Sequence, residues 1–513
     1  MRTTESDVGA SVAGHDGSVV GTVSAGDVEA SGLGTSVSHA SGSGTSDADA
    51  SSTRVSDTRV SDTRVSGAKA CSAGALAEGG FGVGGLVRSL RPGGRWGLGV
   101  WAGVIVGAFV VGEVMRRAGL ATEDALPPLH AKARLLTWQM APAVGYAVVA
   151  VGVLPVLVRV MPWRSLLAVS WGAAAGWAVA LAVSDGPGAL ARPLDAPTEY
   201  PAGLAAIGGH PLRWLRTFTH DLNAYPTHVR GHPPLPTLLF WALDAVGLHG
   251  TLWAASLIIV AGASSAVAIA VTVRVLAGER VARRALPFLA LSPLSLWIAT
   301  SMDAFFLAVG AWGVAFLALR RPLTGGLLLG ALPFLSYGLL PLLAVPSVVL
   351  WMTRPPVRFW LVMALGFAVV PTAFTLGGFW WPNGVHATLD TYLVSGGSAR
   401  RSYSYFLVAD LAVLGILTGP AIAYVLPSCI KRGVATRREL RTEPVLLLAA
   451  AAAVAVLSLD VAGVTKGEVE RIWLPFAAWL LPMASVLRAP ARGWLAAQAV
   501  TAILVQALVL SEW

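Results

Sequence analysis

Long apolar blocks, and not alternating apolar and polar positions, dominate the chain from Trp96 to the C-terminus. Short charged links separate these blocks, and a helix needs about 20 apolar residues to cross a bilayer. The strands of a membrane barrel would instead alternate over roughly ten residues. The pattern therefore predicts an all-α, polytopic membrane protein in which residues 96–513 form one transmembrane domain.

Thirteen membrane spans are expected in this domain. They fall at 97–115, 140–160, 164–183, 251–274, 285–300, 303–320, 323–338, 339–353, 357–377, 405–427, 444–462, 470–487 and 492–510. Each boundary carries an error of about 2–4 residues.

The first 95 residues have a different character, because they are rich in Ser, Gly, Ala, Thr and Asp. They include the period-five repeat TRVSD-TRVSD-TRVSG at 53–67. With few large apolar side chains, such a segment cannot offset the entropy lost on ordering. We predict a disordered cytoplasmic tail at 1–95 and no signal peptide, since no basic-then-apolar start follows Met1. A start codon downstream of Met1 is the alternative.

Composition agrees with a membrane protein and argues against a nucleic-acid partner. The chain is 55% hydrophobic and 13% charged, whereas soluble domains carry about 25% charged residues. The net charge is +9, and the basic excess lies in short links between apolar blocks, as the positive-inside rule expects. The two cysteines, Cys71 and Cys429, suit neither a structural disulfide nor a metal site.

The basic links predict the topology. Those at 274–284, 320–321, 353–358, 431–441 and 488–492 are all expected to face the cytoplasm. All of these links can face the cytoplasm only if residues 234–249 do not span the membrane. This segment is short, begins with prolines and contains Asp244, so we expect a surface helix along the outer leaflet. The outer loops are then 184–250, 377–404 and 461–470.

One link contradicts this scheme. Residues 116–139 contain Arg116, Arg117, Lys132 and Arg134, yet they fall on the outer side.

A polar stretch at 194–244 interrupts the apolar pattern and provides the first candidate site. Asp195 and Glu199 would share one helix face or meet in a tight loop, next to Tyr200. A carboxylate at the membrane surface can remove a proton from an acceptor hydroxyl if partial burial raises its pKa. Two solvated loop acids would give the same pattern.

The same stretch contains Arg230-Gly231-His232-Pro233-Pro234-Leu235, with Asp221 upstream. The double proline fixes an extended segment followed by a helix start. We expect this to hold His232 at the water–membrane boundary, where it can bind a phosphate or orient a carboxylate. Arg230 and Asp221 are expected to line the same acceptor or donor pocket. A structural turn with a satisfied histidine is the alternative.

Basic residues in the two later outer loops are candidates for anion binding. In the loop 461–470, Lys466 precedes Glu470 and Arg471. A guanidinium suits bidentate phosphate contact, although Arg471 could also snorkel to the interface. In the loop 377–404, Arg400 and Arg401 depart from the positive-inside bias, which an anionic ligand would explain. A solvated loop is again the alternative.

Asp303 opens an expected span directly after Ser301 and Met302. An Asp at this place is often only a helix cap. If the loop 184–250 folds back over the membrane, Asp303 joins its carboxylates. The aromatic run 379–381 could line the same pocket, because aromatic faces stack on sugar rings.

Taken together, these residues resemble the GT-C superfamily of polytopic glycosyltransferases. The likeness is to the branch of protein O-mannosyltransferases and aminoarabinose transferases, and to actinobacterial membrane proteins of that type. Its motifs match an acidic element at Asp195, Glu199 and Tyr200, the His-Pro-Pro-Leu run at 232–235, the acidic Asp303 and the late pair Glu470-Arg471. The likeness covers 164–487. It departs from the family where the usual adjacent Asp-Glu pair is spread over 195–199, and where two spans, and not the usual single one, precede the span that bears the loop.

The resemblance implies an inverting transfer of a sugar from a polyprenyl-phosphate donor to a glycan, lipid or protein acceptor. It implies a multi-pass protein of the plasma membrane with an extracytoplasmic active site and no metal or other cofactor. Glu199 or Asp195 would be the catalytic base, with Asp303 as a further catalytic acid residue. The lipid phosphate would be held by Arg471, Lys466, Arg400 and Arg401.

Two other functions remain open. A transporter or lipid flippase would explain the prolines within the expected spans, which are typical of broken helices. No repeated halves appear, however, and charged residues avoid the span centres. A non-catalytic membrane scaffold, whose tail recruits partners through its repeat, is the third hypothesis.

Overall fold

The computed structural model describes residues 94–122, 125–134, 138–395 and 400–511, with the backbone alone for 393–395. The chain divides into two units after Ser72, and every described residue belongs to the second, Ala73–Trp513. The expected tail and its repeat therefore lie outside the described residues, except for 94–95. Those two residues already belong to the first described helix.

Within the described residues, seven helices are long and apolar enough to cross a membrane, and each coincides with an expected span. They are α2 (Gly94–Arg117), η1 (Trp138–Met140) with α3 (Ala141–Val160), α4 (Trp163–Ala182) with η2 (Val183–Asp185), α8 (Thr251–Ala277), α13 (Val357–Leu376), α15 (Tyr403–Ala435) and α16 (Pro444–Ala462). The fold is thus almost entirely helical, as predicted, and its apolar helices are those of a multi-pass membrane protein.

The other six expected spans fall on shorter elements, so the number thirteen is not confirmed. These elements are α9 (Glu279–Ala290), η7 (Pro293–Trp297), α10 (Met302–Ala318), α11 (Pro322–Leu335), η8 (Tyr337–Leu343), α12 (Ala344–Thr353), α17 (Val469–Ile472), α18 (Leu474–Ala477), η11 (Ala478–Val486) and α19 (Arg492–Leu508). Proline is one cause of the interruptions. Ser292 is extended before Pro293 (φ −106°, ψ 156°), because a proline disfavours helical backbone at the preceding residue.

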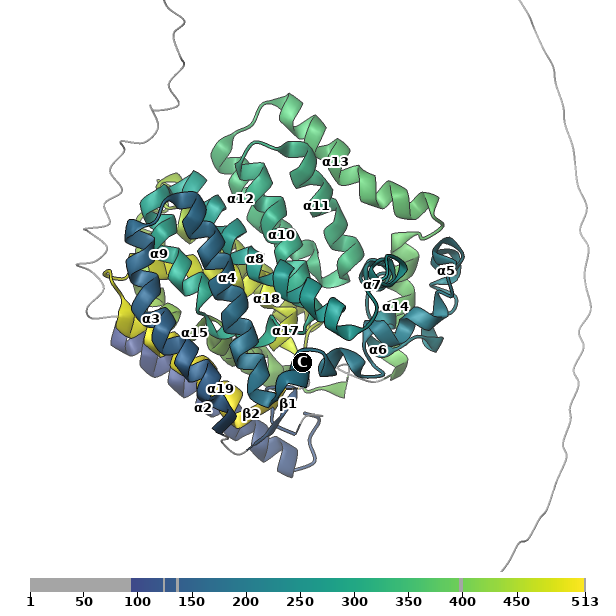
Figure 1. Ribbon diagram of the computed structural model, residues 1–513, viewed down its shortest axis with the longest axis horizontal. Helices are drawn as coiled ribbons and strands as arrows, with labels where there is room; N and C mark the ends of the chain where they lie inside the picture. The colour runs from purple at the N-terminus through teal and green to yellow at the C-terminus, as the bar shows by residue number, and fades with distance from the viewer. Residues whose placement is uncertain (1–93, 123–124, 135–137, 396–399, 512–513) are drawn as a thin grey trace, which may run out of the picture. The chain divides into compact units, whose positions relative to one another are not determined.

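The core lies where α8 packs against α10, α4 and α9. Most of α8 is buried, whereas α2 and α13 are mostly exposed. Figure 1 shows these two helices at opposite borders of the helical part, with α8 and α10 between them. Three tryptophans, Trp177, Trp473 and Trp479, are among the largest fully buried side chains.

The expected loop 184–250 is folded into short elements. They are η3 (Pro187–Leu190), η4 (Arg192–Asp195), η5 (Tyr200–Ala206), α5 (Pro211–Thr217), η6 (Leu222–Ala224), α6 (Thr227–Arg230) and α7 (Leu235–Ala245). The helix α7 begins directly after the double proline, and its 11 residues are too few for a span. The remaining helical elements are α14 (Trp381–Ser395) and η10 (Leu440–Thr442).

A two-stranded antiparallel sheet, which the hydrophobic pattern did not predict, joins distant parts of the chain. Strand β1 (Ala131–Ala133) pairs with β2 (Val509–Ser511), and Lys132 lies opposite Leu510. Figure 1 places both strands beside the labelled C-terminus. The sheet therefore joins residues 131–133 of the link to the end of the described chain.

Local ion pairs reduce the positive charge that made this link disagree with the topology. Arg116 and Arg117 lie 2.8 Å and 2.6 Å from the carboxylate of Glu113. Arg134 pairs with Asp185 at the end of η2. Three of the four basic side chains thus have acidic partners, but Arg116 and Arg117 share one carboxylate, so the positive charge of the link is reduced and not removed.

A kink in α15 depends on one buried amide. Gly419 has a positive φ (74°) within this helix, directly before Pro420. The kink separates backbone groups from their helical partners, and the fully buried side chain of Gln498 in α19 binds two of them. Its Oε1 accepts from the backbone N–H of Ala421 at 3.3 Å, and its Nε2 donates to the carbonyl of Thr418 at 2.8 Å.

We expect Gln498→Leu to destabilise the protein by about 2 kcal/mol, because two buried backbone groups lose their partners. Thermal unfolding in detergent, followed by tryptophan fluorescence, measures the change. Gln139→Leu, at an exposed glutamine, is the matched control and should leave the midpoint nearly unchanged. Equal midpoints for the two variants would contradict the role of the amide.

Candidate functional site

A cavity of about 560 Å³ opens beside β1 and β2. Its wall is formed by residues from η2 to η5, from the start of α6, from η7 and from the turn before α17. The polar side chains on the wall include Glu199, His228, Glu468, Lys132 and Arg192. Figure 1 shows α6, α17 and the two strands close to one another in this region. The cavity therefore gathers polar groups from parts of the chain that are more than 300 residues apart.

Glu199 and His228 form a close pair on this wall. The Oε1 of Glu199 lies 2.8 Å from Nδ1 of His228, and both side chains are about 90% buried. The backbone holds the pair together, because the N–H of His228 donates to the carbonyl of Thr198 at 2.9 Å. Glu199 is the residue directly before η5, which places its side chain at the end of that element.

The other nitrogen of His228 faces Arg471. Its Nε2 lies 3.2 Å from Nη2 of Arg471. A guanidinium only donates, so this contact requires Nε2 to accept. We therefore assign the imidazole proton to Nδ1, the nitrogen that lies 2.8 Å from Oε1 of Glu199.

Arg471 is buried and engaged by two carboxylates. Its Nη1 lies 3.1 Å from Oδ2 of Asp303, and its Nη2 lies 2.6 Å from Oε2 of Glu468. Ser301, which caps α10, donates from Oγ to the same Oδ2 of Asp303 at 3.1 Å. Asp303 is therefore more than a helix cap, since it forms a buried ion pair with a residue 168 positions later.

Glu468 connects this network to a second arginine. Arg401 donates to Oε1 of Glu468 at 3.2 Å and to the carbonyl of Lys466 at 2.7 Å. Burial raises the pKa of Glu468, but the charges of Arg471 and Arg401 outweigh it and lower the pKa to about 2. The carboxylate is therefore ionised near neutral pH.

Aromatic rings pack behind Glu199. Tyr200 stacks on His228 with ring centroids 5.7 Å apart, and it meets the edge of His232 at 5.5 Å. Burial raises the pKa of the Tyr200 phenol, and the charge of Asp303 adds to this. Burial lowers the pKa of His232 to about 4 against the opposing charge of Asp303. The Nδ1 of His232 donates to the carbonyl of His228 at 3.0 Å. The pKa lowered by burial leaves the imidazole neutral near pH 7.

The structure brings together one group of the residues singled out from the sequence. These are Glu199, Tyr200, His232, Asp303, Arg471 and Arg401, with Lys466 contributing its backbone carbonyl. Glu470 is buried nearby, where its Oε1 accepts from the backbone N–H of His130 at 3.0 Å.

A second group lies elsewhere. Asp195 is exposed and accepts from Thr251 Oγ1 at 2.7 Å. Asp221 pairs with the exposed His220 at 2.8 Å. The carbonyl of Arg230 accepts from Thr388 at 3.3 Å, and Arg400 is exposed.

The aromatic run 379–381 does not line the cavity. Phe379 is buried in an aromatic cluster, where it meets Phe218, Phe334 and Phe374. Trp381 donates from its indole N–H to the carbonyl of Pro333 at 2.7 Å. These rings hold α14 and the helices next to it together.

Sequence reasoning missed His228, Lys132 and Arg192. His228 stands four residues before His232, and this spacing was the available signal. In the sequence, Lys132 stood out only as one of the basic residues that contradict the expected topology, because no pattern indicated strand β1. Arg192 had no signal at all, since its place depends on η4 turning its guanidinium to the carbonyl of Asp185 at 3.0 Å.

The described residues contain no group of three or more His, Cys, Asp or Glu side chains that could hold a metal ion. Comparisons with protein families, with curated proteins and with solved structures give no match to the chain.

We expect Glu468→Gln to destabilise the protein by about 3 kcal/mol, the lower end of the cost of breaking a buried ion pair. Arg471 and Arg401 would both lose the Glu468 carboxylate that they share. Thermal unfolding in detergent measures the change, and Glu439→Gln at an exposed position serves as the control. A midpoint equal to that of the control would contradict a structural role for Glu468.

His232 predicts a pH dependence of stability. Its folded pKa of about 4 lies below the ordinary value of 6.5 for a histidine, so between these values the unfolded chain binds a proton that the folded chain does not. The free energy of unfolding therefore falls as the pH is lowered through this window. We expect His232→Gln to lose less thermal stability than wild type between pH 7 and pH 5. The exposed His210, changed to Gln, should leave the wild-type slope intact, and an unaltered slope in His232→Gln would refute the assignment.

Proposed function

We propose that the protein is a membrane glycosyltransferase that moves a sugar from a polyprenyl-phosphate donor to a hydroxyl of its acceptor. The observation that carries this proposal is the pair of Glu199 and His228 on the wall of a 560 Å³ cavity. A carboxylate oriented by an imidazole is suited to general base catalysis. The resemblance to the GT-C superfamily supplies the reaction class.

In the proposed reaction, Glu199 removes the proton of the acceptor hydroxyl while that oxygen attacks the anomeric carbon of the sugar. The bond between this carbon and the phosphate oxygen breaks, and the polyprenyl phosphate leaves with the bonding electron pair. His228 is a positioning residue, because its Nδ1 lies 2.8 Å from the carboxylate of Glu199 and Arg471 fixes its tautomer. Asp303 acts one step further away by holding Arg471.

We assign the donor phosphate to Lys132 and Arg192, which lie on the cavity wall. Arg471 is already engaged by Asp303 and Glu468, and a neutralised guanidinium attracts an anion weakly. Arg401 is committed in the same way to Glu468. In this proposal the buried Arg471 and Arg401 maintain the structure of the site. Lys132 and Arg192 on the wall bind the phosphate.

One observation favours transport as a second candidate. Asp410 and Asp460 are both buried within α15 and α16, and ionisable residues inside membrane helices often mark a transport path. The backbone N–H of Gly467 donates to Asp410 at 3.3 Å, which gives that carboxyl a structural task. Flux of a polyprenyl-phosphate sugar in proteoliposomes, without any transfer, would favour this candidate.

Transfer of labelled sugar from a panel of polyprenyl-phosphate sugars to membrane-extract acceptors tests the proposed function. We expect Glu199→Gln to lower turnover by about 10²–10⁴-fold, the usual contribution of a general base. Asp195→Asn removes an exposed carboxylate four residues away and should remain close to wild type. Wild-type turnover in Glu199→Gln would refute its role as base, and absence of transfer from every donor would contradict the function itself.

A further inference from the structure

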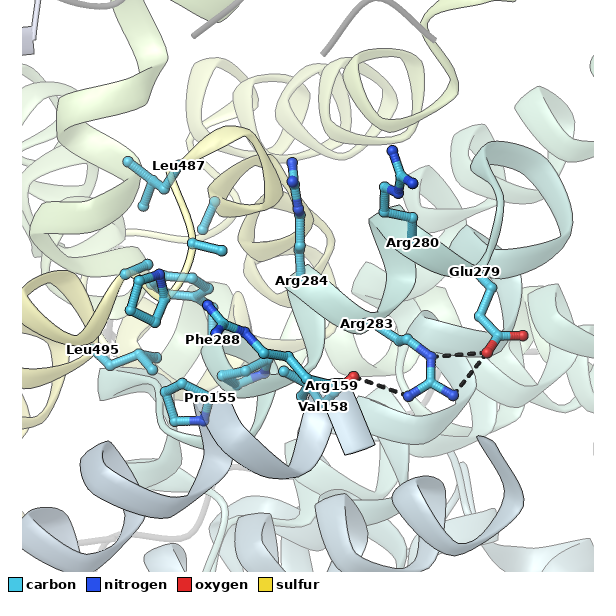
Figure 2. Close-up of a pocket in the computed structure, with 15 residues that line it drawn as sticks. Pro155, Val158, Arg159, Glu279, Arg280, Arg283, Arg284, Phe288, Leu487 and Leu495 are labelled. Carbon is cyan, nitrogen blue, oxygen red and sulfur yellow. Dashed lines mark hydrogen bonds and ion pairs between the residues drawn. The ribbon is translucent and has the colours of Figure 1, made fainter. Parts of the chain in front are cut away.

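A second cavity, of about 480 Å³, lies among α3, α9, η11 and the start of α19. Arginines form one part of its wall, namely Arg159, Arg280, Arg283 and Arg284. Figure 2 shows them around a space that is closed on the other side by apolar side chains. Those apolar residues include Pro155, Phe288, Leu487 and Leu495.

The positive charges in this cavity are only partly compensated. Arg283 pairs with Glu279 at 2.8 Å and also donates to the carbonyls of Val158 and Met161. Among the described residues, Arg159, Arg280 and Arg284 have no acidic partner. Three guanidinium groups therefore face the cavity region without a counter-charge from the described part of the chain.

The arginine side chains of α9 point in two different directions. Arg280 and Arg284 stand one helical turn apart, and Figure 2 shows both extending the same way, whereas Arg283 turns toward Glu279. Burial lowers the pKa of Arg284, and the charge of Arg280 adds to this. Two like charges that repel one another on one helix face are stabilised by a shared anion.

The two cavities lie at opposite ends of the same helices. The end of α4 and the residues after α19 border the first cavity, through Ala182 and Leu510. The last turn of α3, just before α4 begins, and the first part of α19 border the second, through Arg159 and Leu495. Helices of 20 and 17 residues extend over roughly 25–30 Å at 1.5 Å per residue.

The second cavity also lies at the end that carries two of the basic links, 274–284 and 488–492. Such links are typical of the cytoplasmic side, where anionic lipids give the leaflet a negative surface potential. An amphiphile with an anionic head would place its head among the arginines and its chain along the apolar wall.

We propose that this cavity binds the phosphate of an anionic glycerophospholipid, with Arg280, Arg284 and Arg159 as its contacts. Guanidinium groups bind phosphate oxygens through directed, charge-assisted hydrogen bonds. The apolar wall favours a lipid over a soluble phosphate, because Phe288, Leu487 and Leu495 would cover an acyl chain. This site is separate from the proposed transfer site and does not depend on it.

Binding of spin-labelled phosphatidylglycerol to the full chain tests the proposal, in phosphatidylcholine vesicles that contain phosphatidylglycerol as the minor lipid. The double variant Arg280→Gln/Arg284→Gln should bind the labelled lipid about thirtyfold more weakly, because each charge near an anionic lipid is worth about fivefold. The matched control is Arg321→Gln/Arg358→Gln, which removes two exposed arginines outside the cavity. It should retain wild-type binding.

Three results would overturn the proposal. The first is equal loss of binding in the two double variants, which would indicate general surface charge alone. The second is equal retention of spin-labelled phosphatidylcholine, which carries the same phosphate without net charge. The third is displacement of the labelled lipid by inorganic phosphate at equal concentration, which would assign the site to a soluble anion. Wild-type thermal midpoints in the variants establish that a loss of binding is not a loss of folding.

Discussion

The buried guanidinium of Arg471 is the interaction on which the candidate site depends. It meets Asp303 from α10, Glu468 from the turn before α17 and His228 from α6. A charge in this position is costly unless its partners are complete. The need to compensate this charge therefore couples the packing of three distant segments. It also sets the orientation of the His228 imidazole. Glu199 is held beside this network through His228.

This arrangement explains how a membrane protein keeps several ionisable groups close together. The negative charges of Asp303 and Glu468 are balanced by Arg471 and Arg401, so the buried network is close to neutral. Glu199 stands at its edge, on the cavity wall. The network thus provides a rigid support, and the chemistry that we propose takes place beside it.

Much of the fold could be predicted from the sequence, because apolar blocks of membrane length are a strong signal. The seven long helices follow from them. The shorter elements were harder, since prolines such as Pro293 and Pro475 interrupt blocks that are continuous in hydrophobicity. The thirteen expected spans therefore outnumber the seven helices that are long enough to cross a membrane in the described part of the chain.

For the site, the sequence indicated Glu199, Asp303 and Arg471 through their polarity in apolar surroundings. It did not separate Glu199 from Asp195, because four residues of loop can place a carboxylate inward or outward. The structure buries Glu199 against His228 and leaves Asp195 at the surface with Thr251. Lys132 was beyond prediction, since its place comes from a strand of three residues whose partner lies near the C-terminus.

That short sheet has a practical consequence for anyone who handles the protein. Leu510 and Ser511 belong both to β2 and to the cavity wall. An affinity tag or a fluorescent reporter fused behind them would start at the rim of the cavity and would obstruct access to it. The way in which this end of the chain is fused therefore bears on whether the cavity stays accessible.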